Sequence, residues 1–310
     1  MPARSRPVAT AAALLAAALC LASCLPVTRP VVKIGLVAPF EGRYRDVGYE
    51  VIYAVRLAVR EANAAGGVAG DSIELTALDD GGDPASAAEQ ARKLGTDPQI
   101  VGVIGDWLDA TTARAAPVYA GEGLPLLATA AGDLPAGAFR LWLSAGAIQQ
   151  AAASGQLCPL PCDALDNVDW LAQARASGGS AIIFGPPLWG QPQFAALAGP
   201  LANGARFVAP APYPADSTDP GFAARYRAIS NGVEPGSNAV LAYDAARLLF
   251  AAIGMTGGHG ALPTRSGVTA ALAQVKLNGL SGSIQFNAQH NWSGAKGWVY
   301  QWDKGQVRRP

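Results

Sequence analysis

Short apolar runs alternate with helix-like segments along much of the chain, most clearly between residues 100 and 133. An apolar run, Ile100–Ile104, leads through a polar loop into a segment, Ala110–Tyr119, whose apolar residues recur at helical spacing. Two glycines end that segment, and a second apolar run begins with Leu124–Leu127. Short buried runs separated by a helical pattern predict a strand–helix–strand unit of a parallel sheet.

The same alternation is present upstream of this unit. Val31–Val37 and Ser72–Leu78 have the length and apolar content of strands. Tyr49–Ala65 and Ala85–Leu94 have helical patterns, and the apolar residues of the longer one fall on one face. The N-terminal part of the chain is therefore predicted to fold as a parallel α/β sheet covered by helices.

Aspartates stand where several of these elements meet. Asp79, Asp80 and Asp83 form a cluster that is compatible with a metal site or with helix capping. Because Asp83 directly precedes Pro84, capping is favoured: aspartate is a preferred N-cap, and proline suits the first helical position. Asp109 is likewise predicted to be the N-cap of the helix that follows the third strand.

The first residues predict a targeting segment rather than part of the fold. Two arginines precede an apolar core, Val8–Leu21, that is too short to span a bilayer. Leu21-Ala22-Ser23-Cys24 resembles the lipobox of bacterial lipoproteins, which implies a signal peptide over 1–23, a lipid on Cys24 and a tether over 24–30. An ordinary secretory signal with an incidental cysteine is the alternative. No second long apolar segment is evident, so the protein is expected to be anchored without spanning the membrane.

Composition and cysteine count narrow the function classes. The 23 basic and 23 acidic residues show no basic run or basic–aromatic stripe, so nucleic acid is not an expected partner. With Cys20 and Cys24 in the targeting segment, Cys158 and Cys162 remain, and in an exported protein they predict a disulfide. The motifs of serine hydrolases, phosphate-binding loops and zinc proteases are missing from the sequence, so neither an enzyme, a cofactor nor a metal is expected.

Several segments resemble, in the family's order, the type I periplasmic binding proteins. They include VKIGLVAPFEG, EANAAGGVAGDSIELTALDDGGDPASA, VIGDWLDATTARAAPVYAGEGLPLLATAA, VLAYDAARLLFAAI and GLSGSIQFNAQHNWSGAKGWVYQWDKGQV. Within that family they resemble the branched-chain amino-acid-binding branch of ABC importers. The resemblance implies an α/β fold of two lobes, each a parallel sheet flanked by helices, joined by a three-strand hinge and trapping a small molecule between them.

The resemblance also implies where the lobes begin and end. Lobe one is expected over 31–141 and 214–296, and lobe two over 142–213 and 297–310. Only 16 residues lie between Gln150 and Asn167, where the family normally fits at least two further strand–helix units. Lobe two is therefore expected to be shortened, with the CPLPC turn stapling the shortcut.

The chain departs from the family at its amino-acid anchors. Asp109 aligns with the hydroxyl residue that holds the ligand carboxylate, Gly132 with the second hydroxyl, and Pro187 with the acidic partner of the ligand ammonium. The backbone acceptor aligns with Ala130, where any residue serves. Because the Asp109 carboxylate would repel a ligand carboxylate, free leucine, isoleucine and valine are not expected to bind in the family's manner.

Ligands of open parallel sheets gather beyond the carboxyl ends of the strands, facing helix N-termini. The residues expected to converge there as ligand-binding residues are Tyr44, Asp46, Trp107, Asp109, Thr129, Ala130 and Trp189. Aromatic rings with a carboxylate suit a neutral or cationic ligand with a flat or apolar body. The alternative is that Trp107 and Trp189 pack the lobes together and no ligand enters.

The expected function is that of a lipid-anchored extracytoplasmic solute-binding protein of an ABC importer. Its expected partners are a small molecule, amino-acid-like or a related amide or cationic compound, an ABC permease, and the membrane through the lipid. A ligand-sensing role, or a degenerate structural role that does not serve transport, stays open as the alternative.

Overall fold

The computed structural model describes residues 29–129, 133–153, 155–158, 167–177, 182–257 and 262–310. The predicted targeting segment with Cys24 lies outside the described residues. So do Ala130, Gly132 and Cys162 of the predicted site and disulfide.

The N-terminal strands form a five-stranded sheet in the order β2-β1-β3-β4-β5, and every printed pairing is parallel. Its strands are β1 (Val31–Ala38), β2 (Ser72–Asp79), β3 (Ile100–Gly105), β4 (Leu126–Ala128) and β5 (Ala138–Arg140). The strands predicted from the apolar runs are therefore present, with ends that shift by one or two residues. The sheet and its helices are called the first lobe below.

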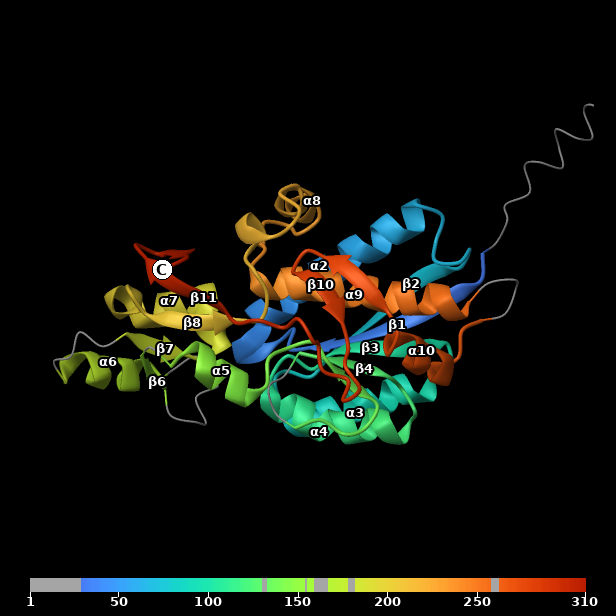
Figure 1. Cartoon of the computed structure of the whole chain (residues 1–310), viewed down its shortest axis with the longest axis horizontal. Coiled ribbons are helices and arrows are strands. Elements are labelled where there is room, and N and C mark those ends of the chain that lie inside the picture. The colour runs from blue at the N-terminus through green and yellow to red at the C-terminus, as the bar shows by residue number, and fades with distance from the viewer. Residues whose placement is uncertain (1–28, 130–132, 154, 159–166, 178–181, 258–261) are drawn as a thin grey trace, which may run out of the picture. The chain divides into compact units, whose positions relative to one another are not determined.

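Helices cover both faces of this sheet (Figure 1). They are α2 (Arg45–Ala64), α3 (Pro84–Thr96), α4 (Asp109–Gly121), α9 (Ser237–Thr256) and α10 (Arg265–Leu272). Successive strand residues point to opposite faces, so Ile34 and Leu36 of β1 pack in the cluster of α2 and α9. Val37 instead packs in the cluster of α3 and α4. The core of the first lobe is thus two apolar layers, one on each side of the sheet.

Helix α9 is long and apolar enough, by length and composition, to cross a membrane. This helix corrects the expectation that no second long apolar segment exists. In the structure 72% of its apolar window is buried, and the helix packs along α2 and α10. We therefore interpret α9 as a core helix of the first lobe.

A second five-stranded sheet has the order β12-β11-β8-β7-β6 and forms, with its helices, the second lobe. Its strands are β6 (Gln156–Leu157), β7 (Ile183–Gly185), β8 (Arg206–Ala209), β11 (Trp298–Asp303) and β12 (Gln306–Arg308). Strands β6, β7 and β8 are parallel, and β11 is antiparallel to both β8 and β12. Its short helices are α5 (Ala145–Ala151), α6 (Val168–Ala176), η2 (Pro187–Gly190), α7 (Pro192–Ala198) and η3 (Gly199–Ala202). The expected two-lobed α/β fold is confirmed. The expectation of a parallel sheet in each lobe is corrected for the second lobe, whose sheet is mixed because β11 runs antiparallel to its neighbours.

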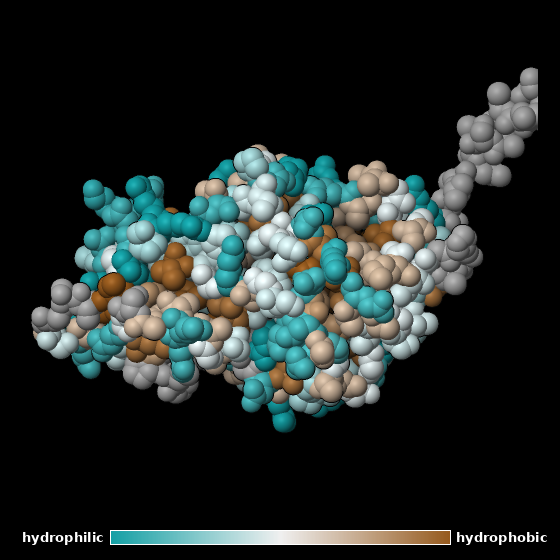
Figure 2. Space-filling view, in the orientation of Figure 1, coloured by the Kyte–Doolittle hydropathy of each residue, from teal (hydrophilic) through white to brown (hydrophobic). Residues whose placement is uncertain are grey.

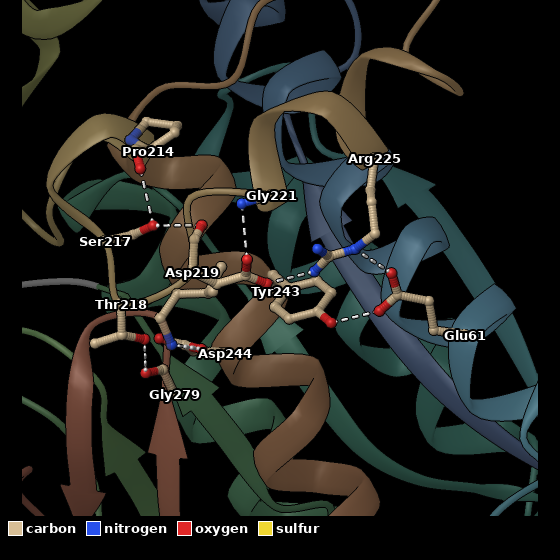
Figure 3. A network of polar contacts seen from close by, with 11 residues as sticks. Glu61, Pro214, Ser217, Thr218, Asp219, Gly221, Arg225, Tyr243, Asp244 and Gly279 are labelled. Carbon is tan, nitrogen blue, oxygen red and sulfur yellow. Dashed lines mark hydrogen bonds and ion pairs between the residues drawn. The ribbon is translucent and has the colours of Figure 1, made fainter.

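A segment between β8 and α9 carries η4 (Pro214–Asp216) and α8 (Phe222–Arg227) and is tied to the first lobe by polar contacts (Figure 3). The Arg225 guanidinium lies 2.8 Å from carboxylate oxygens of both Glu61 and Asp219, and the Tyr243 hydroxyl also donates to Glu61. Asp244 of α9 accepts the amides of residues 280 and 281 at 2.7 and 2.8 Å. These amides lie in the turn between β9 (Lys276–Gly279) and β10 (Gly282–Gln285), so the hairpin is fixed to the core helix.

The two predicted helix caps have different outcomes. Asp83 accepts the Ser86 amide at 2.7 Å and Pro84 occupies the first turn, so this cap is confirmed. Asp109 is the first residue of α4 rather than its N-cap, which is Leu108 with no side-chain cap bond. The prediction was wrong by one position because the Thr112 hydroxyl bonds the carbonyls of residues 106 and 108 and holds the turn before the helix.

Polar residues dominate the face of the molecule seen in Figure 2, and apolar residues on that face are scattered. Among the described residues, the exposed large apolar side chains are Tyr49 in α2, Leu197 in α7, Met255 in α9 and Leu262 in a loop. Single exposed apolar residues are normal on a protein surface. The surface shown therefore gives no reason to expect a large apolar interface.

Candidate ligand-binding site

The register of the first sheet brings the ends of its strands to one edge. Ala38 pairs with Asp79, Gly105 pairs with Ala128, and Ala128 pairs with Arg140. Because the strands are parallel, the loops that follow them all start at this carboxyl edge. Ligands of open α/β sheets bind outside this edge, so the edge is the candidate site.

Asp79 fixes the loop that follows β1. Its carboxylate accepts the amides of Phe40 at 2.7 Å, Gly81 at 2.9 Å and Glu41 at 3.3 Å. A carboxylate that accepts several amides is well satisfied without a metal. The same loop leads into η1 (Gly42–Tyr44), so Asp79 positions the predicted site residue Tyr44.

Tyr44 lies half-buried against the turn after β2. Gly82 in that turn has φ +74°, and a side-chain carbon there would lie 2.7 Å from the Tyr44 ring and 3.3 Å from Leu108. Only glycine combines this backbone conformation with such close packing. Tyr44 therefore packs against the loops that follow β2 and β3, next to the candidate site.

Asp106 is fully buried directly after β3, and the sequence analysis did not select it. Its carbonyl accepts the hydroxyls of Thr112 at 2.7 Å and Thr129 at 3.2 Å. Neither carboxyl oxygen has a hydrogen-bond partner among the described residues. Burial, with a further contribution from the charge of Asp80, raises the pKa of Asp106 to about 8. The group is therefore largely protonated at neutral pH.

Trp107 and Asp109 follow on the same loop. Trp107 is 8% exposed, and its indole N–H has no partner among the described residues. Asp109 is exposed at the start of α4, where its negative charge interacts favourably with the helix dipole. An unpartnered donor and an exposed carboxylate thus lie two residues apart at the carboxyl edge.

Arg140 adds a cation that the sequence analysis missed. Its side chain is 9% exposed and donates to the Asn291 side chain at 3.0 Å. Burial lowers the pKa of Arg140, and the charges of Asp133 and Asp109 oppose that effect. Arg140 therefore offsets part of the negative charge of Asp109 and Asp133 at this edge. A lone arginine in an apolar strand, AFRLWL, is the signal that could have found it.

The remaining predicted residues have mixed positions. Thr129 is 9% exposed and lies at the edge through its bond to Asp106. Asp46 is half-buried in the first turn of α2, with the Arg45 guanidinium 3.9 Å away. Ala130 lies outside the described residues. The structure thus brings Tyr44, Trp107, Asp109 and Thr129 to the end of the sheet and leaves the backbone acceptor undescribed.

Trp189 occupies a different environment from the one expected. It is fully buried in the second lobe, and its ring stacks on Phe194 with centroids 4.5 Å apart. A side-chain carbon at Gly185 would overlap its ring, and its carbonyl accepts the Trp302 indole N–H at 2.6 Å. In this conformation Trp189 packs within the second lobe and not between the lobes, where the alternative interpretation had expected it. A contact between Trp189 and a ligand stays a prediction.

Two further expectations concern chemistry outside the crevice. The described residues contain no group of three or more His, Cys, Asp or Glu side chains that could hold a metal. Cys158 is buried and disulfide-bonded. The specific pairing with Cys162 stays a prediction.

A fold of two α/β lobes with a polar crevice edge defines the class of the protein. A sequence model of the family described as periplasmic binding protein matches residues 31–157 and 145–306. The chain therefore belongs to the periplasmic binding protein family. The resemblance to the type I proteins of the branched-chain amino-acid branch is confirmed.

Curated relatives match only part of the chain. Identity is 30% over 93 residues with an amino acid binding protein of Pseudomonas aeruginosa and 31% over 100 residues with a Leu/Ile/Val-binding protein of Citrobacter freundii. These matches cover 30% and 32% of this chain. The chain spans about a quarter of the length of these relatives, 25% and 27%.

Solved structures match over most of the chain. The branched-chain amino acid transporter substrate-binding protein LivJ of Streptococcus pneumoniae, in complex with isoleucine, has a TM-score of 0.74 at 22% identity, over 90% of this chain and 98% of that one. An ABC transporter solute-binding protein from R. palustris, in complex with benzoate, has a TM-score of 0.70 at 19% identity, over 90% of this chain and 95% of that one. At these identities the likeness establishes the fold.

Proposed function

We propose that this chain is the substrate-binding protein of an ABC importer, which captures a small molecule at the carboxyl edge of the first sheet and closes the second lobe over it. The observation that carries the proposal is the Trp107 indole N–H, which has no partner among the described residues and lies two residues from the exposed Asp109. A nearly buried donor without a partner is costly. A ligand acceptor at this position removes that cost.

The ligand class follows from the charges at the edge. Asp109 suits an ammonium, amidinium or amide donor, and the Trp107 ring suits a flat or apolar body. Arg140, buried beside the charges of Asp109 and Asp133, reduces the repulsion that a ligand carboxylate would meet. We therefore propose an amino-acid-like, amide or cationic compound. Leucine, isoleucine and valine are not expected to bind in the family's manner, since the hydroxyl anchor is Asp109.

The proposal includes the cellular context. The lipobox-like sequence supports lipidation of Cys24 and an extracytoplasmic location on the membrane surface. An ABC permease is the proposed partner, because relatives of this branch are named for transport or amino-acid binding. The lobe boundaries near residues 141, 213 and 297, and the staple by Cys158 and Cys162, belong to the same proposal.

A thermal-shift screen of amino acids, amides, polyamines and aromatic acids tests it, followed by calorimetry of each hit. We expect a hit to lose about 1–3 kcal/mol of binding free energy in Asp109→Ala or Trp107→Phe, as expected for one hydrogen bond to a charged or buried group. Glu89→Ala is the control, because Glu89 is exposed on α3 and pairs only with Lys93 in a described contact. Micromolar binding of leucine that persists in Asp109→Ala would contradict the proposed ligand class. Failure of every compound class would favour the structural alternative.

A further inference from the structure

A buried carboxylate links the two lobes. Glu50 of α2 is 5% exposed, and its Oε2 accepts the Gln191 side-chain amide at 3.0 Å. The same carboxylate accepts the Asn238 side-chain amide at 3.3 Å and the Ala239 backbone amide at 2.9 Å, both from the first turn of α9. Glu50, Asn238 and Ala239 belong to the first lobe, whereas Gln191 follows η2 in the second lobe. Gln191 is thus the donor that comes from the other lobe.

The second lobe holds Gln191 in place by its backbone. Its amide donates to the Leu188 carbonyl, and its carbonyl accepts the Phe194 amide, each at 3.0 Å. The neighbouring Gly190 carbonyl accepts the Tyr213 hydroxyl at 2.9 Å. A side-chain carbon at Gly190 would lie 2.6 Å from the Phe207 ring, so the backbone sits directly on the core of the second lobe. The Gln191 side chain therefore moves together with η2 and the core of the second lobe.

The carboxylate needs its donors because it is buried. Taking a carboxylate out of water is costly unless hydrogen bonds replace its hydration. The N-terminus of α9 supplies part of this replacement through the Ala239 amide and the helix dipole. If the second lobe moves away, the Gln191 bond is lost and Oε2 keeps only the longer Asn238 bond. Separation of the lobes is therefore opposed at this point.

We propose that Glu50 and Gln191 are positioning residues that hold the second lobe against the first and so set how far the crevice opens in the absence of ligand. The proposal adds to the binding function proposed above, because the contact acts on lobe geometry rather than on ligand. Hydrogen bonds to charged groups contribute about 1.5–3 kcal/mol. Loss of this one is expected to raise the opening equilibrium about ten- to hundred-fold.

The test compares two single variants of the full-length protein without ligand. Gln191→Ala removes the bond between the lobes, whereas Asn238→Ala removes a bond to the same carboxylate within the first lobe. We expect Gln191→Ala to increase the radius of gyration in small-angle X-ray scattering and to accelerate amide hydrogen exchange in residues 187–194 about ten-fold or more. Asn238→Ala is expected to lower the melting temperature without either change. Equal scattering and exchange in both variants would overturn the proposal.

A rescue distinguishes positioning from general stability. Glu50→Gln alone should open the lobes, because it removes the charge that strengthens the bond from Gln191 and leaves one oxygen to accept from three donors. The double variant Glu50→Gln, Gln191→Glu again provides a donor and an acceptor across the lobes, and we expect its radius of gyration to return toward the wild-type value. A double variant as open as Gln191→Ala would contradict the assignment. If circular dichroism shows that Glu50→Gln does not fold, the comparison of Gln191→Ala with Asn238→Ala still tests the proposal. Because no ligand is used, a failed ligand screen leaves this result unaffected.

Discussion

The two lobes reach the same α/β plan by different means. In the first lobe, α2 and α9 have 20 residues each and β1 and β2 have eight, and buried aliphatic residues form a layer on each face of the sheet. In the second lobe, α5 and α7 have seven residues and β6 has two. Its core depends instead on aromatic contacts around Trp189 and Phe207. The first lobe is thus held by long regular elements, and the second by a few large side chains.

This difference fits the separate roles that we propose for the lobes. The charged and partnerless groups of the candidate site lie at the carboxyl edge of the first lobe, on loops that rigid elements position. The second lobe contributes Gln191 and a compact aromatic core, which suit a cover that moves as one body. Substitutions in the aromatic core should therefore lower the stability of the second lobe alone. Substitutions at the sheet edge should change the properties of the first lobe.

The largest effect is expected for Trp189→Ala. The ring is fully buried and stacks on Phe194, and removal of a buried tryptophan typically costs about 3–5 kcal/mol. Urea denaturation should show this loss, and hydrogen exchange should place it in the second lobe while β1 and α9 stay protected. Leu248→Ala in α9 is the matched core control for the first lobe. Equal loss of protection in both lobes of the Trp189 variant would show that the lobes unfold together.

The regular first lobe was the part that the sequence predicted well. Apolar runs and helical spacing located β1, β2, β3 and the helices between them because each element is long enough to show its period. The position of Trp189 could not be predicted, since the segment FGPPLWG has no period and its packing depends on Gly185 and Phe194. The Glu50–Gln191 contact joins positions 141 residues apart, so no local pattern reveals it. Asp106 and Arg140 are each an ionisable residue among apolar neighbours, yet only the register shows that they share an edge.

The second effect concerns the pH dependence at the edge of the first lobe. The Asp106 pKa is raised from 3.8 to about 8 in the folded protein. Between these values the folded state binds one more proton than the unfolded state, so stability falls as pH rises. The slope is about 1.4 kcal/mol per pH unit well below pH 8 and half of that at pH 8, so wild type should lose about 2 kcal/mol between pH 6 and pH 8. The window begins at pH 6 because the Asp80 pKa, raised to about 6, contributes mainly below it.

Asp106→Asn should remove this slope, because an amide does not titrate. Chemical denaturation of both proteins at pH 6, 7 and 8 measures the difference. We expect the variant to be more stable than wild type at pH 8 and to lose that advantage toward pH 6. An unchanged slope in the variant would assign the pH dependence to other groups.

The third effect tests the disulfide of the second lobe. Cys158 is buried and disulfide-bonded, and the short loop closed by the predicted bond to Cys162 should contribute at most about 2–3 kcal/mol. Cys158→Ser is expected to lower stability within that range and to speed exchange in β6 and β7, without a change in the first lobe. Thiol titration of the denatured, unreduced wild-type protein is expected to find neither cysteine free. Two reactive thiols would remove this staple from the account of the second lobe.

The smallest effect is expected where the segment between β8 and α9 meets the helices of the first lobe. Arg225 bonds Glu61 and Asp219, yet its side chain is 39% exposed and those of its partners are 34% and 38% exposed. Water screens such pairs, so Arg225→Ala should cost about 1 kcal/mol or less. The neighbouring Asp244 is buried and accepts two backbone amides, so Asp244→Ala should cost more, about 1–3 kcal/mol, because the amides lose their acceptor. Thermal denaturation of both variants checks the order. A larger loss for Arg225→Ala would mean that the exposed ion pairs, rather than the buried aspartate, hold this part of the first lobe together.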